Sequence, residues 1–252
     1  MKIILSPAKK MRVDTDSMPW EALPAFLPET EKILSYLRGK VNSELQALWG
    51  CSDQIARENV ERLRHMDLRS GLTPAILSYD GIAYQYMAPS VFEDSHLAYV
   101  QEHLRILSGF YGVLKPMDGV TPYRLEMQAR ARVDGYRDLY AFWGRTLYDA
   151  VRDEDGLILN LASREYSKCI EKYLTPADRF ISCTFCEMVK GRLAQKATFA
   201  KMARGEMVRY LAEHQITEPE QMKHFDRLGY RFREDLSTGR EYVFERIDEK
   251  IS

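Results

Sequence analysis

Basic side chains occur at several places where the chain would turn, either at the end of a predicted strand or after a proline. Lys9 follows the apolar run at the N-terminus, and Arg124 comes two residues after Pro122. Lys201 and Arg204 lie close together between a predicted strand and a predicted helix. Strand ends that meet at one edge of a sheet would concentrate these charges on one concave surface. We therefore expect these four side chains to line one cleft that binds phosphate groups.

The stretch Ser-Gly-Phe-Tyr-Gly is a second candidate for phosphate binding. Leucine and valine spacing predicts a helix over 96–107, which Gly109 would end with a positive φ. Gly109 and Gly112 then resemble the turn of a helix-hairpin-helix, whose backbone N–H groups hold a phosphate. Arg105 and Lys115 would add positive charge nearby. A hairpin that serves only for packing is the alternative.

A second chemistry is open to an overlapping set of residues. Carboxylates, an amide and a hydroxyl could converge with the basic groups to form the acid–base and anion-holding pocket of a small-molecule enzyme. Its members would be Lys9, Asp80, Arg124, Glu126, Asn160, Ser163 and Lys201. Asn160 and Ser163 lie at or just past the end of the apolar strand predicted over 157–161, where open α/β sheets bind ligands. A lysine beside carboxylates also has a pKa that burial can tune.

Metal-binding patterns are weak. Cys183 and Cys186 form a CxxC pattern, but they lie in a predicted strand, where side chains three apart point to opposite faces. We expect this pair to be buried, without a shared metal and without a disulfide. His96 and His103 would share a helix face, but no carboxylate lies at a ligand spacing beside both. We therefore expect no metal and no cofactor.

Common catalytic and nucleotide-binding motifs are absent from the chain. It has no Walker loop, no GxGxxG after a strand, no HExxH and no GxSxG. The 36 basic and 37 acidic residues nearly balance, so total charge predicts neither a nucleic-acid nor a membrane partner. Charge is distributed unevenly, however: residues 101–216 hold 18 basic and 15 acidic side chains, a net +3. Residues 1–100 and 217–252 each carry a net −2.

The length of 252 residues suits one large domain, which we predict to span 1–252. The apolar run at the N-terminus is too short for a signal peptide, and no stretch is long enough to span a membrane. Four cysteines are too few for a disulfide scaffold. We expect a cytoplasmic protein that has no membrane partner.

Predicted strands and helices alternate without a strict βαβ rhythm, which predicts an α/β fold with a mixed central sheet and flanking helices. The expected strands cover 2–5, 157–161, 179–189, 192–199, 230–233 and 241–246. The expected helices cover 29–38, 43–50, 53–66, 96–107, 139–152 and 203–215. Hairpin turns are predicted at 190–191 and 237–239.

Several of these segments together resemble the bacterial YaaA family of peroxide stress proteins. The resemblance rests on Ile4–Lys9, Leu104–Pro116, Pro122–Met127, Leu139–Gly144, Asn160–Tyr166 and Lys201–Gly205, which follow one another in order over nearly the whole chain. It implies a cytosolic protein of the peroxide response that limits damage from unincorporated iron. It also implies a basic cleft and a helix-hairpin-helix-like element that binds DNA. Many relatives carry a lysine in a Phe-Lys-Gly-Asp-Val-Tyr-like stretch, where this chain has Ser78–Tyr84 without that lysine.

Two functions follow as the main hypotheses, and a third, an iron-binding protein, lacks a cluster of ligand residues in the sequence. In the first, the protein binds DNA, in duplex, distorted or branched form, by phosphate contacts and by shape. The residues expected to contact DNA are Lys9, Arg105, Gly109, Gly112, Lys115, Arg124, Lys168, Lys201 and Arg204. In the second, the alternative pocket holds a small anionic ligand and acts on it. A long electropositive groove would favour the first, and a closed pocket of a few hundred cubic ångströms would favour the second.

Overall fold

A computed structural model describes residues 1–247 of the chain. Its main sheet has eight strands, in the order β11-β12-β9-β8-β1-β5-β6, with β10 paired to β9. The strands are β1 Lys2–Leu5, β5 Leu104–Ser108, β6 Gly112–Leu114, β8 Leu157–Asn160, β9 Arg179–Val189, β10 Arg192–Ala194, β11 Tyr230–Phe232 and β12 Glu241–Arg246. Strands β5, β1, β8, β9 and β12 are parallel, whereas β6, β10 and β11 pair antiparallel with their neighbours. The prediction of a mixed central sheet in an α/β fold is confirmed.

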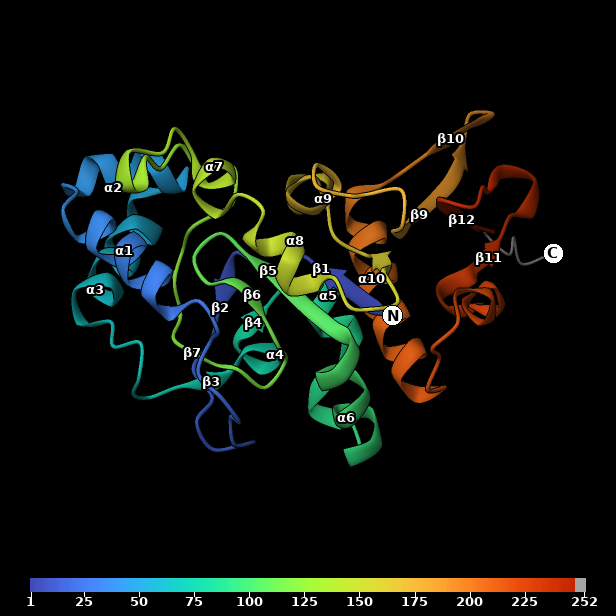
Figure 1. Cartoon of the computed structure of the whole chain (residues 1–252), viewed down its shortest axis with the longest axis horizontal. Coiled ribbons are helices and arrows are strands. Elements are labelled where there is room, and N and C mark those ends of the chain that lie inside the picture. The colour runs from blue at the N-terminus through green and yellow to red at the C-terminus, as the bar shows by residue number, and fades with distance from the viewer. Residues whose placement is uncertain (248–252) are drawn as a thin grey trace.

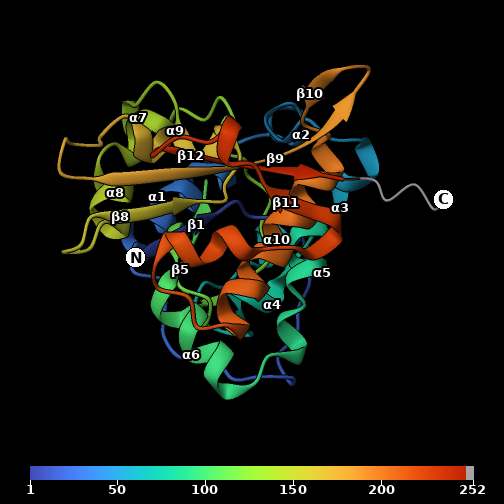
Figure 2. The same cartoon turned by 90° about the vertical axis from the view of Figure 1, so that its right-hand side faces the viewer.

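Helices surround this sheet. They are α1 Leu27–Arg38, α2 Asn42–Trp49, α3 Asp53–His65, α4 Ala75–Ser78, α5 Ile82–Met87, α6 Asp94–His103, α7 Leu139–Trp143, α8 Thr146–Val151, α9 Arg164–Glu171 and α10 Ala197–Glu213. Short 3-10 helices cover Pro89–Val91, Val133–Gly135, Pro219–His224, Arg227–Gly229 and Glu234–Leu236. Figure 1 shows α1, α2 and α3 at one end of the molecule and β11 and β12 at the other. Figure 2 shows β8, β9 and β12 with α10 below them.

The centre of the sheet is apolar because its strands are covered on both faces. Ile3, Ile4 and Leu5 of β1 are all at most 1% exposed. An unbroken apolar run of this kind is typical of a central parallel strand. Two small ladders outside the main sheet hold the connections in place: β2 Lys10–Met11 pairs with β4 Tyr79–Asp80, and β3 Thr73–Pro74 pairs with β7 Gly119–Val120.

The predicted helix-hairpin-helix is wrong. The helix expected over 96–107 ends at His103, and the chain continues as strand β5, a tight turn and strand β6. Gly109 does not have a positive φ, but Gly112 does, at 78°. A Cβ atom on Gly109 would lie 2.9 Å from the carbonyl oxygen of Leu125, so Gly109 is needed for a close backbone approach instead. The apolar residues of 104–107 serve a buried strand, and no helical hairpin forms here.

Two other helix boundaries differ from the prediction. Helix α10 begins at Ala197 rather than at 203, and β10 ends at Ala194, so Lys201 and Arg204 lie within the helix. The helix predicted over 139–152 is divided into α7 and α8 at Gly144, whose φ of 51° does not continue a helix. The hairpin turn at Lys190 and Gly191 is confirmed, with both residues at positive φ.

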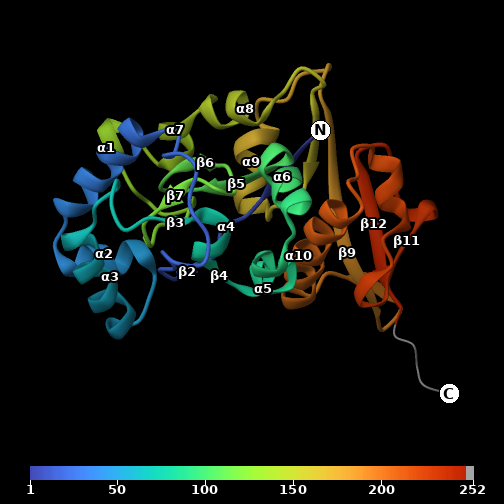
Figure 3. The same ribbon diagram turned by 90° about the horizontal axis from the view of Figure 1, so that it is seen from below.

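Helix α10 approaches α5 closely, as the view from below in Figure 3 shows. The contact is made at Gly205, because a Cβ atom there would lie only 1.8 Å from the carbonyl oxygen of Ala83. Helix α10 also packs against α6 and β9. The helix that carries Lys201 and Arg204 is therefore held close to the start of α5.

Candidate functional site: a cationic pocket at the switch point of the sheet

The site lies beyond the carboxyl ends of β1 and β8, where the order of the sheet reverses. Strand β1 has β5 on one side and β8 on the other, and the chain reaches β5 first and returns to β8 later. Open α/β sheets bind ligands in the crevice at such a switch point. Ser6, which follows β1, and Ser163, which begins α9 after β8, meet here: the Ser163 N–H donates to the Ser6 Oγ over 2.8 Å. The Ser6 hydroxyl also donates to the Ser163 Oγ over 3.2 Å.

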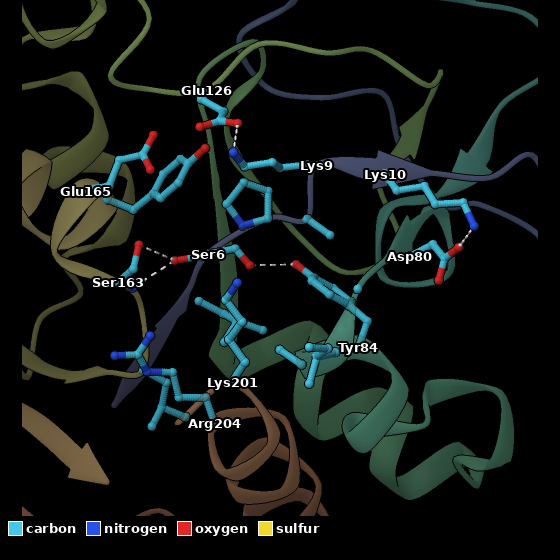
Figure 4. Close-up of a pocket in the computed structure, with 18 of the residues that line it drawn as sticks. Ser6, Lys9, Lys10, Asp80, Tyr84, Glu126, Ser163, Glu165, Lys201 and Arg204 are labelled. Atoms are coloured by element: carbon cyan, nitrogen blue, oxygen red, sulfur yellow. Dashed lines mark hydrogen bonds and ion pairs between the residues drawn. The ribbon is translucent and has the colours of Figure 1, made fainter. Parts of the chain in front are cut away.

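A pocket of about 390 Å³ opens at this point (Figure 4). Its lining comes from the loop after β1, from β4 and α5, from the segment 123–126, from the start of α9 and from α10. The polar side chains in the lining belong to Ser6, Lys9, Lys10, Asp80, Tyr84, Tyr123, Arg124, Glu126, Ser163, Glu165, Tyr166, Lys201 and Arg204. The expectation that Lys9, Arg124, Lys201 and Arg204 line one concave surface is confirmed. Five basic side chains face three carboxylates.

Two separate ion pairs lie among the residues that line the pocket (Figure 4). The Lys9 Nζ lies 2.5 Å from the Glu126 Oε1, and the Lys10 Nζ lies 2.6 Å from the Asp80 Oδ2. Lys10 and Asp80 are directly opposite one another in the β2–β4 ladder, and the hydrogen bond from Lys10 lowers the pKa of Asp80. Both lysines are exposed, so these pairs add little stability. Their effect is to fix two carboxylates at the rim of the pocket.

Three cations remain without a partner in the part of the chain that the structure describes. Arg124, Lys201 and Arg204 make no ion pair there, and the Nε atoms of both arginines are buried without a hydrogen-bond acceptor. Burial lowers the pKa of the Arg204 guanidinium, but an arginine stays charged. Figure 4 shows Lys201 and Arg204 rising from α10 towards Ser6 and Ser163. Buried donors that lack an acceptor are costly, and an anionic ligand would supply the missing acceptor.

Glu165, in the first turn of α9, gives the pocket a group suited to proton transfer. Its Oε1 accepts a hydrogen bond from the backbone N–H of Gln128 over 3.1 Å. Burial raises the pKa of Glu165, against the hydrogen bond from Gln128 and the charges of Lys9 and Lys168, and the neighbouring charge of Glu126 adds to the rise. A carboxyl group with a raised pKa is better suited to general acid–base catalysis than an ordinary one. Tyr84 is held in place at the side of the pocket because its hydroxyl donates a hydrogen bond to the Ser6 carbonyl oxygen over 3.0 Å.

The alternative pocket is assembled with one exception. Lys9, Asp80, Arg124, Glu126, Ser163 and Lys201 all line it. Asn160 does not, because its side chain is turned inward: its Nδ2 donates to the Ser182 Oγ and its Oδ1 accepts from the Ala162 N–H. Asn160 thus ties β8 to β9 and shapes the turn that leads to Ser163.

Several residues expected to contact DNA do not line this pocket. Arg105 is buried and donates to the carbonyl oxygens of Gln101 and Leu104, towards the amino end of β5. Because β6 runs antiparallel to β5, Lys115 is carried to that same amino end, opposite to the pocket. Gly109 and Gly112 form the turn of this hairpin. Lys168 lies on α9, with its Nζ 4.0 Å from the centre of the Tyr140 ring.

Sequence reasoning missed Ser6, Lys10, Tyr84 and Glu165 as members of the site. Lys10 adjoins Lys9, which was predicted, and Ser6 comes directly after an apolar strand, which was a usable signal. Glu165 follows Ser163 by two residues at the start of a helix, but its burial depends on the packing of the 126–130 loop. Nothing in the sequence around Tyr84 distinguishes this residue from a tyrosine that packs in the core.

Residues 1–247 contain neither a cluster of metal-ligating side chains nor a helix that could span a membrane. No group of three or more His, Cys, Asp or Glu side chains there could hold a metal ion. Cys183 and Cys186 are both buried in β9, the strand predicted for them, and are not joined by a disulfide. No helix in this range is long and apolar enough to cross a bilayer.

The fold and the pocket define an α/β protein that holds unpaired cations at the switch point of its sheet. Sequence comparison then identifies its relatives. The profile of the family described as "Peroxide stress protein YaaA" matches residues 1–236. A UPF0246 protein of Agathobacter rectalis is 59% identical over 246 residues, which cover 98% of this chain and 99% of the relative. A UPF0246 protein of Limosilactobacillus reuteri is 54% identical over 248 residues, 98% of this chain and 100% of the relative. The chain belongs to the YaaA family of peroxide stress proteins.

Proposed function

We propose that the pocket binds phosphate groups of DNA and that the protein acts on damaged DNA in the cytoplasm during peroxide stress. The observation that carries this proposal is the set of three unpartnered cations, Arg124, Lys201 and Arg204, around one cavity at the switch point. Arginine and lysine are the side chains that bind phosphate oxygens most strongly. The family description supplies the setting of peroxide stress.

The chemistry of that setting supports DNA as the ligand. Ferrous iron and hydrogen peroxide generate hydroxyl radicals, and DNA is damaged by them. A protein that holds distorted or broken DNA would limit this iron-linked damage. The pocket volume of about 390 Å³ suits a group the size of a nucleotide rather than a duplex. Intact duplex would therefore bind across the mouth of the pocket, and distorted DNA would reach into it.

Salt-dependent binding tests this function. Fluorescence anisotropy of a labelled duplex, with and without a short unpaired bubble, is measured from low to physiological salt. We expect Lys201→Ala and Arg204→Ala each to weaken binding and to lower the salt slope by about one unit per lost phosphate contact. Lys115→Ala is the matched control, because Lys115 is an exposed lysine at the opposite end of the strands. No binding at low salt, or an equal loss in the control, would contradict the proposal.

A specific observation also favours a small-molecule enzyme as the second candidate. The pocket is lined by Glu165, whose pKa is raised, and also by Arg124, Lys201 and Arg204, which make no ion pair among residues 1–247. Such a site could hold an anionic substrate and transfer a proton to or from it. Thermal-shift screening with small phosphorylated and carboxylated metabolites separates the candidates. A metabolite that stabilises the wild type but not Arg204→Ala, in a protein that binds no DNA, would favour the enzyme.

A further inference from the structure

A second pocket adjoins the first and shares a wall with it. This second pocket, of about 790 Å³, lies between α1, the carboxyl end of α2 and the segment 126–130. Lys9 and Glu126, which form the ion pair at the rim of the first pocket, line the second pocket as well. A ligand that fills one pocket can therefore reach the other by passing over a single ion pair.

Trp49 gives the second pocket a donor without a partner. The residue is 6% exposed and lines the pocket at the end of α2, and its buried indole Nε1 has no hydrogen-bond acceptor among residues 1–247. An indole N–H can only donate, and a buried indole usually finds an acceptor. An oxygen or ring nitrogen of a ligand that reaches this N–H would supply the missing acceptor.

The charges around the second pocket lead to the same class of ligand. Lys40 is paired with Glu44 over 3.1 Å and lies 5.0 Å from the centre of the Tyr36 ring, and Lys9 is paired with Glu126. Arg130 is exposed, and it has no ion pair or side-chain hydrogen bond in the described part of the chain. After pairing, the second pocket therefore offers one free cation and one free N–H donor.

One segment of chain joins the two pockets. Arg124 faces the first pocket and Arg130 lines the second, six residues further along. Between them, the Gln128 N–H donates to Glu165, which fastens the segment to α9. The two unpaired arginines are thus presented in a fixed order along one anchored stretch of backbone. A polyanion with regularly spaced charges would meet both.

We propose that the two pockets are consecutive subsites for one unpaired nucleic-acid strand. This inference rests on the proposed function and deepens it. One nucleotide lies in the first pocket with its phosphate at Arg124, Lys201 and Arg204. The next nucleotide lies in the second pocket, with its phosphate at Arg130 and an acceptor of its base or sugar at the Trp49 N–H. The strand crosses the Lys9–Glu126 ion pair between them. Bases that stay stacked and paired in a duplex cannot each enter a separate pocket, so the ligand is a single strand or a locally opened duplex.

Ligand length is the variable that tests the inference. The affinities of a deoxythymidine mononucleotide and of a single-stranded tetranucleotide are measured by calorimetry with the full chain. We expect the tetranucleotide to bind at least about tenfold more tightly, because it engages both subsites at a high effective concentration. In Trp49→Phe and in Arg130→Gln the ratio of the two affinities should fall towards one. Arg57→Ala, at an exposed arginine on α3 outside both pockets, should keep the wild-type ratio.

The outcomes distinguish this inference from the function on which it rests. Equal affinities for the two ligands in the wild type, or an unchanged ratio in Arg130→Gln, would overturn the second subsite. Arg130 is exposed, so that variant tests the idea even if Trp49→Phe disturbs folding. If neither ligand binds, or if binding does not depend on Lys201 and Arg204, the proposed function itself fails. A ratio that falls in both variants and stays high in Arg57→Ala supports the two-subsite strand.

Discussion

Replacing Gly205 by alanine should separate α10 from α5 and weaken the site together with the fold. The added Cβ would lie 1.8 Å from the Ala83 carbonyl oxygen and 2.7 Å from its carbon, where van der Waals contact needs well over 3 Å. Because both partners are helix backbone, neither can move without moving its helix. Overpacking of this kind costs about 3 kcal/mol at the upper end of its usual range. The higher helix propensity of alanine returns about 1 kcal/mol.

The net loss for Gly205→Ala is therefore about 2 kcal/mol, which corresponds to a fall in Tm of about 4–8 °C for a chain of this size. Thermal unfolding followed by circular dichroism measures it. Gly239→Ala is the control, since no atom lies within 4 Å of a Cβ there, and it should stay within about 0.5 kcal/mol of the wild type. The variant should also bind phosphate ligands more weakly, because α10 carries Lys201 and Arg204. A Gly205→Ala protein as stable as the wild type would refute the argument that this contact sets the position of α10.

Three further predictions concern ionisable groups. Burial raises the pKa of Asp118 to about 6, so its carboxyl keeps a proton in the folded state between about pH 4 and 6. Urea unfolding should show that the wild-type free energy of unfolding falls by up to about 3 kcal/mol as the pH rises through that window, and Asp118→Asn should lack this fall. Burial would raise the pKa of Asp178, but hydrogen bonds from Thr175, Tyr148 and Arg152 lower it, so the stability that the carboxylate contributes is present above about pH 4 and is lost as the pH falls below that value. By the same assay, Asp178→Asn should unfold with about 2 kcal/mol less free energy at pH 7, and its stability should depend less on acid pH than that of the wild type. Among the four thiols, iodoacetamide at pH 8 should modify Cys51 first in the native protein, because the other three cysteines are buried and burial raises the pKa of their thiols. If mass spectrometry finds Cys183 or Cys186 modified as fast as Cys51, this prediction is wrong.

The pattern of apolar residues predicted the central strands correctly where it was compatible with only one type of secondary structure. The apolar runs of 2–5 and 157–161 became β1 and β8, and the cations that follow the first strand and β10 were correctly expected to meet. The segment 104–107 was mistaken for helix because its leucines continue the 3–4 spacing of the preceding helix. A short buried strand is apolar throughout and therefore also fits that spacing, so the pattern alone cannot separate the two.

The second pocket could not have been found from the sequence. Trp49 lies in an amphipathic helix, and an indole that lacks an acceptor has the same sequence signature as one that packs in a core. Arg130 is one of several arginines in its part of the sequence. That it has no ion-pair partner among residues 1–247, whereas Lys9 and Lys40 in the same pocket are paired, is visible only in the structure. Glu165 was visible in the sequence, but its raised pKa depends on contact with a loop about 37 residues away. Partners that are distant in the chain decide which charges remain unpaired, and local patterns do not record them.

The distribution of ion pairs around the first pocket argues for a ligand rather than for stability. Lys9 and Lys10, the exposed cations, are paired with carboxylates, although such pairs add little to folding. Among residues 1–247, Arg124 and Arg204 have buried Nε atoms and no carboxylate partner, although a buried charge without a partner is costly. A sequence selected only for stability would either pair these guanidinium groups with acids or replace them by apolar side chains. Both guanidinium groups line the cavity at the switch point, where an anionic ligand of the kind we propose would supply the charge that they lack.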